Sequence, residues 1–287
     1  MIAFGRYEVS SIVNGALRLD GGAMFGVVPK VLWQNVTDVD SLNRIPLATR
    51  TLLAIDRAAR RIVLVDTGCG TKWSPKDAER YGVQPDPMAI PRTLQAAGFV
   101  PEDVTDVIVT HLHFDHNGGL TSWYDEPGGP TTLVYPRARH WIHRGQWEHA
   151  HKPTVRDRAS YLPQDFASLA GNRLHFVEGE KPQPSIDGID WFVSKGHTPY
   201  QLLPVFSAEK NGLMFVGDIV PTIAHLRLGW VMGYDLFPLT TIAEREQIYD
   251  RCIRDGMSIA FAHDPAHGGV SLGGTVERPI VSNTLDL

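Results

Sequence analysis

Four side chains that commonly bind metal ions stand within six residues, directly after an apolar stretch at 106–109. Residues 110–119 read Thr-His-Leu-His-Phe-Asp-His-Asn-Gly-Gly. In an extended segment alternate side chains point the same way, so the two histidines of His-x-His can share one ion. Imidazole and carboxylate together suit divalent ions such as zinc. Burying three histidines and an aspartate is costly unless a cation offsets their desolvation, so the segment predicts a metal site at a strand end. The candidate ligands in it are His111, His113, Asp115 and His116.

The overall composition is that of an ordinary globular protein, with 43% hydrophobic and 21% charged residues in a chain of 287. We expect one domain over residues 1–287. The net charge of -5, without a block of basic residues, argues against nucleic acid or an anionic membrane as a partner. No signal peptide or membrane-spanning stretch is evident, so the expected location is the cytoplasm. Cys69 and Cys252 fit neither a disulfide framework nor a CxxC pair and are interpreted as packing residues.

Short apolar runs predict the strands. Residues 50–55 and 61–65 flank a polar stretch and predict a hairpin that ends at the turn Asp66-Thr67-Gly68. Further strands are expected at 107–109, 132–135, 191–193, 213–216 and 258–261, all short and rich in β-branched or aromatic residues.

Helical patterns lie between these runs. They cover 88–97 and 138–150, and a third helix is expected to open at Thr241 with a capping box to Glu244. The mixture indicates an α/β protein with helices on the faces of its sheets. Residues 152–164 contain two prolines and little periodicity, so the region around 150–166 is a candidate insertion or lid loop.

The motif resembles the signature of the metallo-β-lactamase superfamily, His-x-His-x-Asp-His after a buried strand. The resemblance extends over most of the chain and matches a histidine in Gly-His-Thr-Pro, an aspartate in Val-Gly-Asp and a histidine in Ala-His-Asp, which are His197, Asp218 and His263. It implies one metal bound by His111, His113 and His197, another bound by Asp115, His116 and His263, and a bridge between them at Asp218. It also implies that Asp66 supports the site without binding metal.

The fold that the resemblance implies is a four-layer αβ/βα sandwich, in which two mixed sheets carry helices on their outer faces and the metals lie at one edge. The implied cofactors are two divalent ions per chain, zinc first, with manganese, cobalt or iron as alternatives.

Two such ions can share a water, lower its pKa and polarise a substrate oxygen, so the expected nucleophile is a bridging hydroxide. The expected catalytic residues are Asp115, which would accept the proton of the water and pass it to the leaving group, and the bridging Asp218. No Gly-x-Ser-x-Gly elbow suggests a nucleophilic serine.

The sequence constrains the class of substrate less than it constrains the metal site. Relatives with this ligand set include lactonases, glyoxalase II-type thioesterases, phosphotriesterases, β-lactamases and nucleases. Here Gly-His-Thr-Pro continues with Tyr200-Gln201, unlike glyoxalase II, which argues against a glutathione thioester. The residues expected to line the substrate pocket are His225, Trp230, Met232 and Tyr234. Such a surface suits an uncharged small-molecule lactone or ester, as in the quorum-quenching lactonase and organophosphate hydrolase branch, with phosphotriester or β-lactam hydrolysis as the alternatives.

One position departs from that branch. Acyl-homoserine lactonases carry a tyrosine three positions after the bridging aspartate, where this chain has Pro221. Tyr234 or His225 could supply a similar hydrogen-bond donor, or both could simply pack.

The other histidines do not predict a further metal site, and other functions fit the sequence less well. His140, His143, His149 and His151 lack carboxylate partners in a ligand-like pattern and fit a pocket wall or amphipathic helix better than a second metal site; His267 fits a loop. An iron-dependent redox function is disfavoured because diiron relatives usually carry glutamate where His113 stands. A homo-oligomer is compatible with the sequence.

Overall fold

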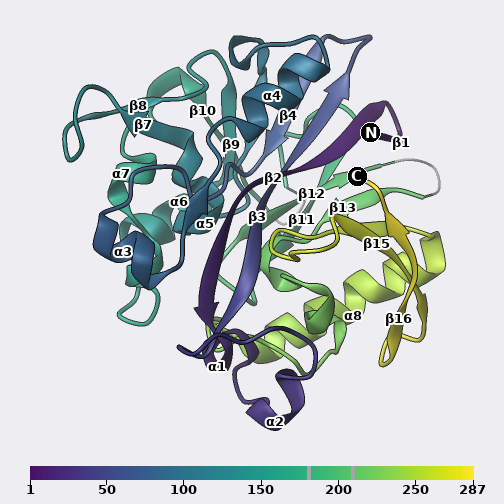
Figure 1. Ribbon diagram of the computed structural model, residues 1–287. Helices are drawn as coiled ribbons and strands as arrows, with labels where there is room; N and C mark the ends of the chain where they lie inside the picture. Colours follow the sequence, from purple (N-terminus) through teal and green to yellow (C-terminus); the bar gives the residue numbers. More distant parts are fainter. Residues whose placement is uncertain (180–181, 208–210) are drawn as a thin grey trace.

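The computed structural model describes residues 1–179, 182–207 and 211–287 (Figure 1). Within these residues the larger sheet has the strand order β1-β2-β3-β4-β6-β9-β10, with β5 paired to β2. Its strands are β1 (Ile2–Phe4), β2 (Tyr7–Asp20), β3 (Arg44–Asp56), β4 (Arg61–Val65), β5 (Gln84–Pro85), β6 (Asp106–Ile108), β9 (Arg139–His143) and β10 (Leu174–Val177). The pairings from β4 to β10 are parallel and those from β1 to β4 antiparallel, so the sheet is mixed.

The second sheet has the order β11-β12-β13-β14-β15-β16 and is also mixed, because β13 pairs with β14 in parallel. Its strands are β11 (Ile189–Ser194), β12 (Gln201–Phe206), β13 (Leu213–Phe215), β14 (Ser258–Ala260), β15 (Gly269–Gly274) and β16 (Pro279–Leu285). A small ribbon pairs β7 (Thr121–Trp123) with β8 (Thr131–Leu133).

Helices connect these strands. The α-helices are α1 (Gly21–Phe25), α2 (Lys30–Trp33), α3 (Pro75–Arg80), α4 (Ala89–Ala96), α5 (Phe114–Asn117), α6 (Arg144–His151), α7 (Pro163–Phe166) and α8 (Pro238–Asp255). The 3-10 helices are η1 (Pro101–Asp103), η2 (Gly118–Leu120), η3 (Arg158–Ser160), η4 (Gly171–Arg173), η5 (Gly217–Ile219) and η6 (Ile223–Leu226). In the described ranges no helix is both long and apolar enough to cross a membrane.

Three apolar clusters define the layers. One lies between the sheets and joins Val63 and Ile108 of the first to Phe206 and Phe215 of the second. Another packs the outer face of the first sheet against α4 and the segment around α6 and α7. The third packs the outer face of the second sheet against α8. Figure 1 shows α8 on one flank and α4, α6 and α7 on the other, which is the αβ/βα sandwich expected from the sequence.

Most predicted elements are present. The hairpin is formed by β3 and β4, paired from Leu52↔Val65 to Asp56↔Arg61, and the helix expected at 88–97 is α4. Each of the five further strand segments overlaps an observed strand.

Two helix predictions were wrong in part. The first half of the stretch predicted helical at 138–150 is the strand β9, and only its second half is the helix α6. β9 lies between β6 and β10, with Ile142 and Trp141 buried, so tertiary pairing overrides the local pattern. The last helix begins at Pro238 rather than at Thr241. Proline suits a first helical turn, and Glu244 does not form the expected capping box but accepts hydrogen bonds from the backbone N–H groups of Lys195 and Gly196.

Candidate metal centre and its cavity

The motif turn is held against the loop that follows β4. The backbone N–H of Thr67 donates to the carbonyl oxygen of His116 at 2.7 Å. A Cβ on Gly118 would lie 2.2 Å from the carbonyl oxygen of Cys69, and one on Gly119 would lie 2.4 Å from that of Thr67. The two glycines of the motif therefore permit a backbone approach that fixes the turn bearing the candidate ligands.

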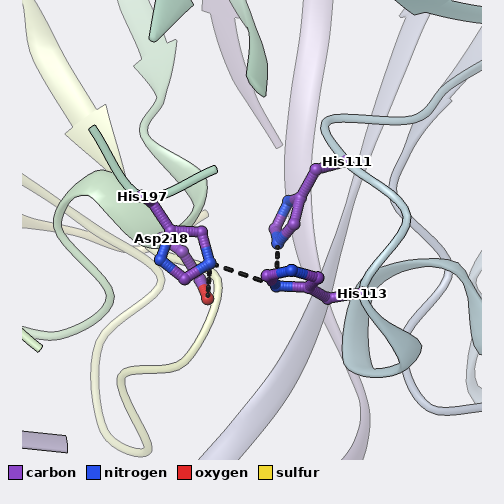
Figure 2. A group of neighbouring side chains, drawn as sticks. All are labelled: His111, His113, His197 and Asp218. Carbon is purple, nitrogen blue, oxygen red and sulfur yellow. Dashed lines mark hydrogen bonds and ion pairs between the residues drawn. The ribbon is translucent and has the colours of Figure 1, made fainter. Parts of the chain in front are cut away.

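The first group of candidate ligands joins both sheets (Figure 2). His111 and His113 follow β6, whereas His197 follows β11 and Asp218 lies in η5 after β13. One ligand atom from each of the four lies within 4.8 Å of all the others. Nδ1 of His113 is 3.0 Å from Nε2 of His111 and 3.1 Å from Nε2 of His197. This spacing could hold one metal ion.

The second group shares Asp218 with the first. It consists of Asp115, His116, Asp218 and His263, and all four are buried. Nε2 of His263 lies 3.0 Å from Nε2 of His116 and 3.5 Å from Oδ2 of Asp115. The structure thus brings together all seven candidate ligands expected from the sequence, in two groups.

The carboxylate of Asp218 faces both groups. Its Oδ1 lies 3.1 Å from Nε2 of His116 and 3.0 Å from Nε2 of His263, while its Oδ2 lies 3.3 Å from Nε2 of His197. Despite these short distances, the buried Oδ1 accepts no hydrogen bond in the described part of the chain. An acceptor that faces ring nitrogens in this way is what a cation between them would satisfy.

Asp66 orients two of the imidazoles, those of His116 and His111. It directly follows β4 and has a positive φ of 58°. A carboxylate accepts only, so Nδ1 of His116, 2.8 Å away, donates to it, and Nε2 of the same ring faces Asp218 and His263. Thr110 donates to Asp66 through its backbone N–H and its hydroxyl, and that hydroxyl lies 3.0 Å from Nδ1 of His111. The same carboxylate therefore orients His111 and His116.

Backbone and carboxylate groups orient two more histidines. Nδ1 of His197 lies 2.9 Å from Oδ1 of the buried Asp235, and Nδ1 of His263 lies 2.9 Å from the carbonyl oxygen of Ala48. Both rings therefore donate from Nδ1 and present Nε2 to the groups. The sequence did not identify Asp235 or Ala48, because neither stands in a motif. Each is also far along the chain from the histidine that it contacts, so no local pattern predicts the contact.

His113 is turned the other way. Its Nδ1 faces His111 and His197, while its buried Nε2 has no hydrogen-bond partner within the described ranges. The ring packs edge-on against Tyr161, with centroids 4.7 Å apart. The hydroxyl of Tyr161 lies 2.8 Å from Oγ1 of Thr198, the neighbour of His197. Tyr161 thus holds the two histidines relative to one another, a role that the sequence did not reveal.

The electrostatics differ among the five imidazoles of the two groups. Burial, reinforced by neighbouring imidazoles, holds the pKa values of His111 and His113 well below the ordinary value, so both rings are neutral. Burial acts to raise the pKa of Asp218, but the imidazoles of His116 and His263 hold that pKa well below its usual range. Burial acts to lower the pKa values of His116, His197 and His263, but the carboxylate of Asp218 raises all three above the ordinary value, so a metal ion that binds these rings would displace protons from them.

A cavity of about 190 Å³ opens onto the two groups. Five of the candidate ligands line it, namely His113, Asp115, His197, Asp218 and His263. One wall is apolar and consists of Leu19, Met24, Leu47, Phe114 and Met232. Four more lining residues come from the 152–164 segment, Arg156, Asp157, Ala159 and Ser160, and Tyr81, Gly233 and Tyr234 complete the lining.

Two of the four predicted pocket residues lie in this cavity, and two do not. Met232 and Tyr234 line it. His225 is fully buried elsewhere: its ring stacks on Phe25, Nδ1 lies 2.8 Å from Oγ1 of Thr222, and Nε2 lies 2.9 Å from the carbonyl oxygen of Met24. Trp230 lines a larger surface groove of about 880 Å³ that includes none of the seven candidate ligands. The prediction was wrong for these two because η6 turns the chain inward before it reaches the cavity at Met232.

The remaining histidines form no third group of ligands within the described residues. His140 and His143 belong to β9, and Nδ1 of His143 accepts from the backbone N–H of Gly145 at the start of α6. His149 pairs with Asp157 at 2.6 Å, and His267 lies 3.4 Å from Asp264.

Comparison with known proteins identifies the family. Residues 54–248 match Lactamase_B, the metallo-beta-lactamase superfamily. The chain belongs to this superfamily. The signature motif, His197 and Asp218 lie within the matched region, whereas His263 follows it.

More specific relatives are distant in sequence. The chain is 24% identical over 177 residues to the N-acyl homoserine lactonase AttM of Rhizobium radiobacter, a match that covers 60% of this chain and 62% of that protein. A probable metal-dependent hydrolase from Staphylococcus aureus is 28% identical, with a TM-score of 0.84 over 99% of this chain and 100% of that one. AidC, a dizinc quorum-quenching lactonase solved with the product N-hexnoyl-L-homoserine, has a TM-score of 0.77 at 18% identity, over 99% of this chain and 97% of that one.

Proposed function

We propose that the chain is a dinuclear metal-dependent hydrolase that opens lactones or related uncharged esters. The observation that carries the proposal is Asp218, whose two carboxylate oxygens face two separate groups of candidate ligands. The resemblance to a probable metal-dependent hydrolase and to N-acyl homoserine lactonases supports the same class. Zinc is our first choice of metal, since histidine nitrogens dominate both groups, and manganese, cobalt and iron are the alternatives.

The proposed ligand sets are those implied by the motif. His111, His113 and His197 would hold one ion, Asp115, His116 and His263 the other, and Asp218 would bridge them. When bound, such a pair supplies an activated water at neutral pH and polarises the carbonyl of the ester. Asp66 would keep His111 and His116 in the metal-binding tautomer through the contacts described above.

The chain's own groups would manage the protons. Asp115 lines the cavity with its carboxylate beside His263, where it can accept a proton from the attacking water and return it to the leaving alkoxide. Tyr234 lines the same cavity, and burial, together with Asp115, raises the pKa of its hydroxyl to about 12. The hydroxyl therefore keeps its proton at neutral pH and would donate it in a hydrogen bond to the carbonyl oxygen of the substrate.

The apolar wall of the cavity suits an ester with a hydrocarbon portion. This wall can bury that portion, and a lactone has no net charge to desolvate. A cavity of about 190 Å³ suits a small ring with its nearest substituents, and the remainder of a longer substrate would extend through the mouth.

A substrate panel with metal-loaded protein tests the proposal. The panel comprises N-hexanoyl homoserine lactone, γ-butyrolactone, an aryl ester, a phosphotriester and a cephalosporin, and metal content is measured on the same samples. We expect the highest kcat/KM on the lactones, two ions per chain, and loss of activity on chelation. A preference for the phosphotriester or the cephalosporin would overturn the substrate class, and a single ion per chain in the active protein would overturn the dinuclear centre.

A further inference from the structure

The 152–164 segment forms a fixed wall of the cavity. Asp157 lines the cavity but is fully engaged: Nε2 of His149 lies 2.6 Å from its Oδ2, and both the backbone N–H and the hydroxyl of Thr154 donate to its Oδ1. Tyr161 ties the end of the segment to Thr198. Side chains that project from this segment toward the cavity are therefore held in place.

Arg156 is an exposed residue of this segment that lines the cavity and reaches the backbone at 233–235. Its Nη2 donates to the carbonyl oxygen of Gly233 at 2.5 Å and lies 3.5 Å from that of Asp235. Gly233 also lines the cavity, between Met232 and Tyr234 in the chain. The guanidinium thus stands between the polar wall and the loop that carries the proposed hydrogen-bond donor Tyr234.

The positive charge of Arg156 is not neutralised by the residues around it. Among the residues that the structure describes, no carboxylate oxygen lies within 4.0 Å of the guanidinium, and the neighbouring Asp157 is occupied by His149 and Thr154. Arg156 is also the one lysine or arginine in the lining of this cavity within the described ranges. A guanidinium has five N–H donors, and its known contacts here are made through Nη2. Donors remain for an oxygen of a bound substrate.

We propose that Arg156 determines specificity by donating to an amide carbonyl oxygen on the substituent of the substrate, so that the site selects acylamino lactones over alkyl lactones of equal length. The inference rests on the proposed lactonase function and deepens it. With the ring at the candidate metal centre, a ring substituent leaves toward the mouth, where the apolar wall can receive a hydrocarbon chain and Arg156 can receive the polar group next to the ring.

Two matched substrates separate this role from a structural one. N-hexanoyl homoserine lactone carries the amide, and α-heptyl-γ-butyrolactone has the same chain length without it. Arg156→Met keeps much of the side-chain volume but removes every donor. Since a hydrogen bond to a charged group contributes about 1.5–3 kcal/mol, we expect it to lower kcat/KM for the amide substrate about 10- to 100-fold, mainly through KM. We expect the alkyl substrate to change by less than about threefold. Arg158→Met, an exposed arginine of η3 outside the cavity lining, should leave both values unchanged.

The possible outcomes are distinct. An equal loss on both substrates would mean that Arg156 only braces the loop at Gly233, and no loss on either would also overturn the proposal. If the wild type opens neither lactone, the proposed function fails. In that case the role of Arg156 is tested separately by the binding of two cyclopentanones, which carry the same two substituents on a ring that cannot be hydrolysed. Only the cyclopentanone with the amide should bind more weakly to metal-loaded Arg156→Met than to the metal-loaded wild type.

Discussion

The carboxylate of Asp66 accepts a hydrogen bond from Nδ1 of His116, 50 residues further along the chain, at 2.8 Å. Both side chains are almost completely buried. Asp66 accepts from the hydroxyl of Thr110 as well, and so serves both groups of candidate ligands from one strand end. A residue outside the cavity lining thereby orients one imidazole in each candidate group.

Replacing Asp66 with asparagine should weaken metal binding without unfolding the chain. The amide offers one acceptor oxygen where the carboxylate offers two, so the hydrogen bonds to Thr110 and His116 cannot all persist. Loss of such outer contacts typically reduces metal affinity about 10- to 100-fold, which a zinc titration against a competing chelator would measure. Asp190→Asn, on the exposed face of β11, is the matched control. Unchanged affinity in Asp66→Asn would contradict the supporting role.

The two candidate groups should lose their ions separately. We expect His111→Ala and His263→Ala each to lower the metal content from two ions to one, because each removes a nitrogen from a different group. The measurement is the metal-to-protein ratio after desalting. His267→Ala, a partly exposed histidine close to His263 in sequence, should retain both ions. Loss of both ions from either ligand variant would indicate one cooperative centre instead.

Tyr234→Phe should reduce the rate of the chemical step. Tyr234 lines the cavity and its hydroxyl stays protonated, so removal of the hydroxyl would take away the proposed donor to the developing oxyanion. Loss of one such donor typically lowers kcat about 10²-fold. Steady-state kinetics on a lactone should show this fall with little change in KM, whereas Tyr124→Phe, at an exposed position, should behave as wild type. A change in KM alone would assign Tyr234 to packing.

A buried ion pair predicts a pH-dependent stability. Nζ of Lys72 lies 3.1 Å from Oδ1 of Asp165, and it also donates to the carbonyl oxygens of Gly118 and Thr121. Burial raises the pKa of Asp165 from 3.8 to about 6, although Lys72 opposes the shift. The folded state therefore holds this proton more tightly than the unfolded chain does. Its contribution to stability is fully present below about pH 3.8 and is lost as the pH rises through about 6.

Asp165→Asn removes that titration. Between pH 4 and pH 7 the free energy of unfolding of the wild type should fall relative to that of the variant by up to about 3 kcal/mol. Urea unfolding of both proteins at several pH values measures the difference between their free energies of unfolding. Other titrating groups and metal release contribute equally to both proteins, so their contributions cancel in this difference. If the difference between the two free energies of unfolding does not vary with pH, the folded state does not raise the pKa of Asp165, and the prediction is wrong.

The sequence predicted the candidate ligands because each lies in a short motif directly after a strand, where few backbone paths are available. His197, Asp218 and His263 follow β11, β13 and β14 in the same manner as His111 follows β6. The layered arrangement also followed from local patterns, since the strands are apolar and the helices lie between them.

The features that the sequence could not reveal depend on long-range geometry. Local pattern cannot show that Trp141 is covered on both sides by β6 and β10, so β9 resembled a helix. Nor can it show that η6 turns His225 into the core and returns Tyr234 to the cavity. The ring of His113 packs against Tyr161, 48 positions further along the chain, and no spacing rule encodes that contact.

Each candidate group takes donors from both sheets, which gives bound ions a mechanical consequence. An ion held by His116 from one sheet and His263 from the other would act as a cross-link that closes a very long chain loop. Like a disulfide, such a cross-link would reduce the conformational entropy of the unfolded chain. The sheets could then separate only after coordination bonds broke. The lifetime of the native state would follow the exchange rate of the metal, and supply of the ion would set how long the molecule survives as well as whether it reacts.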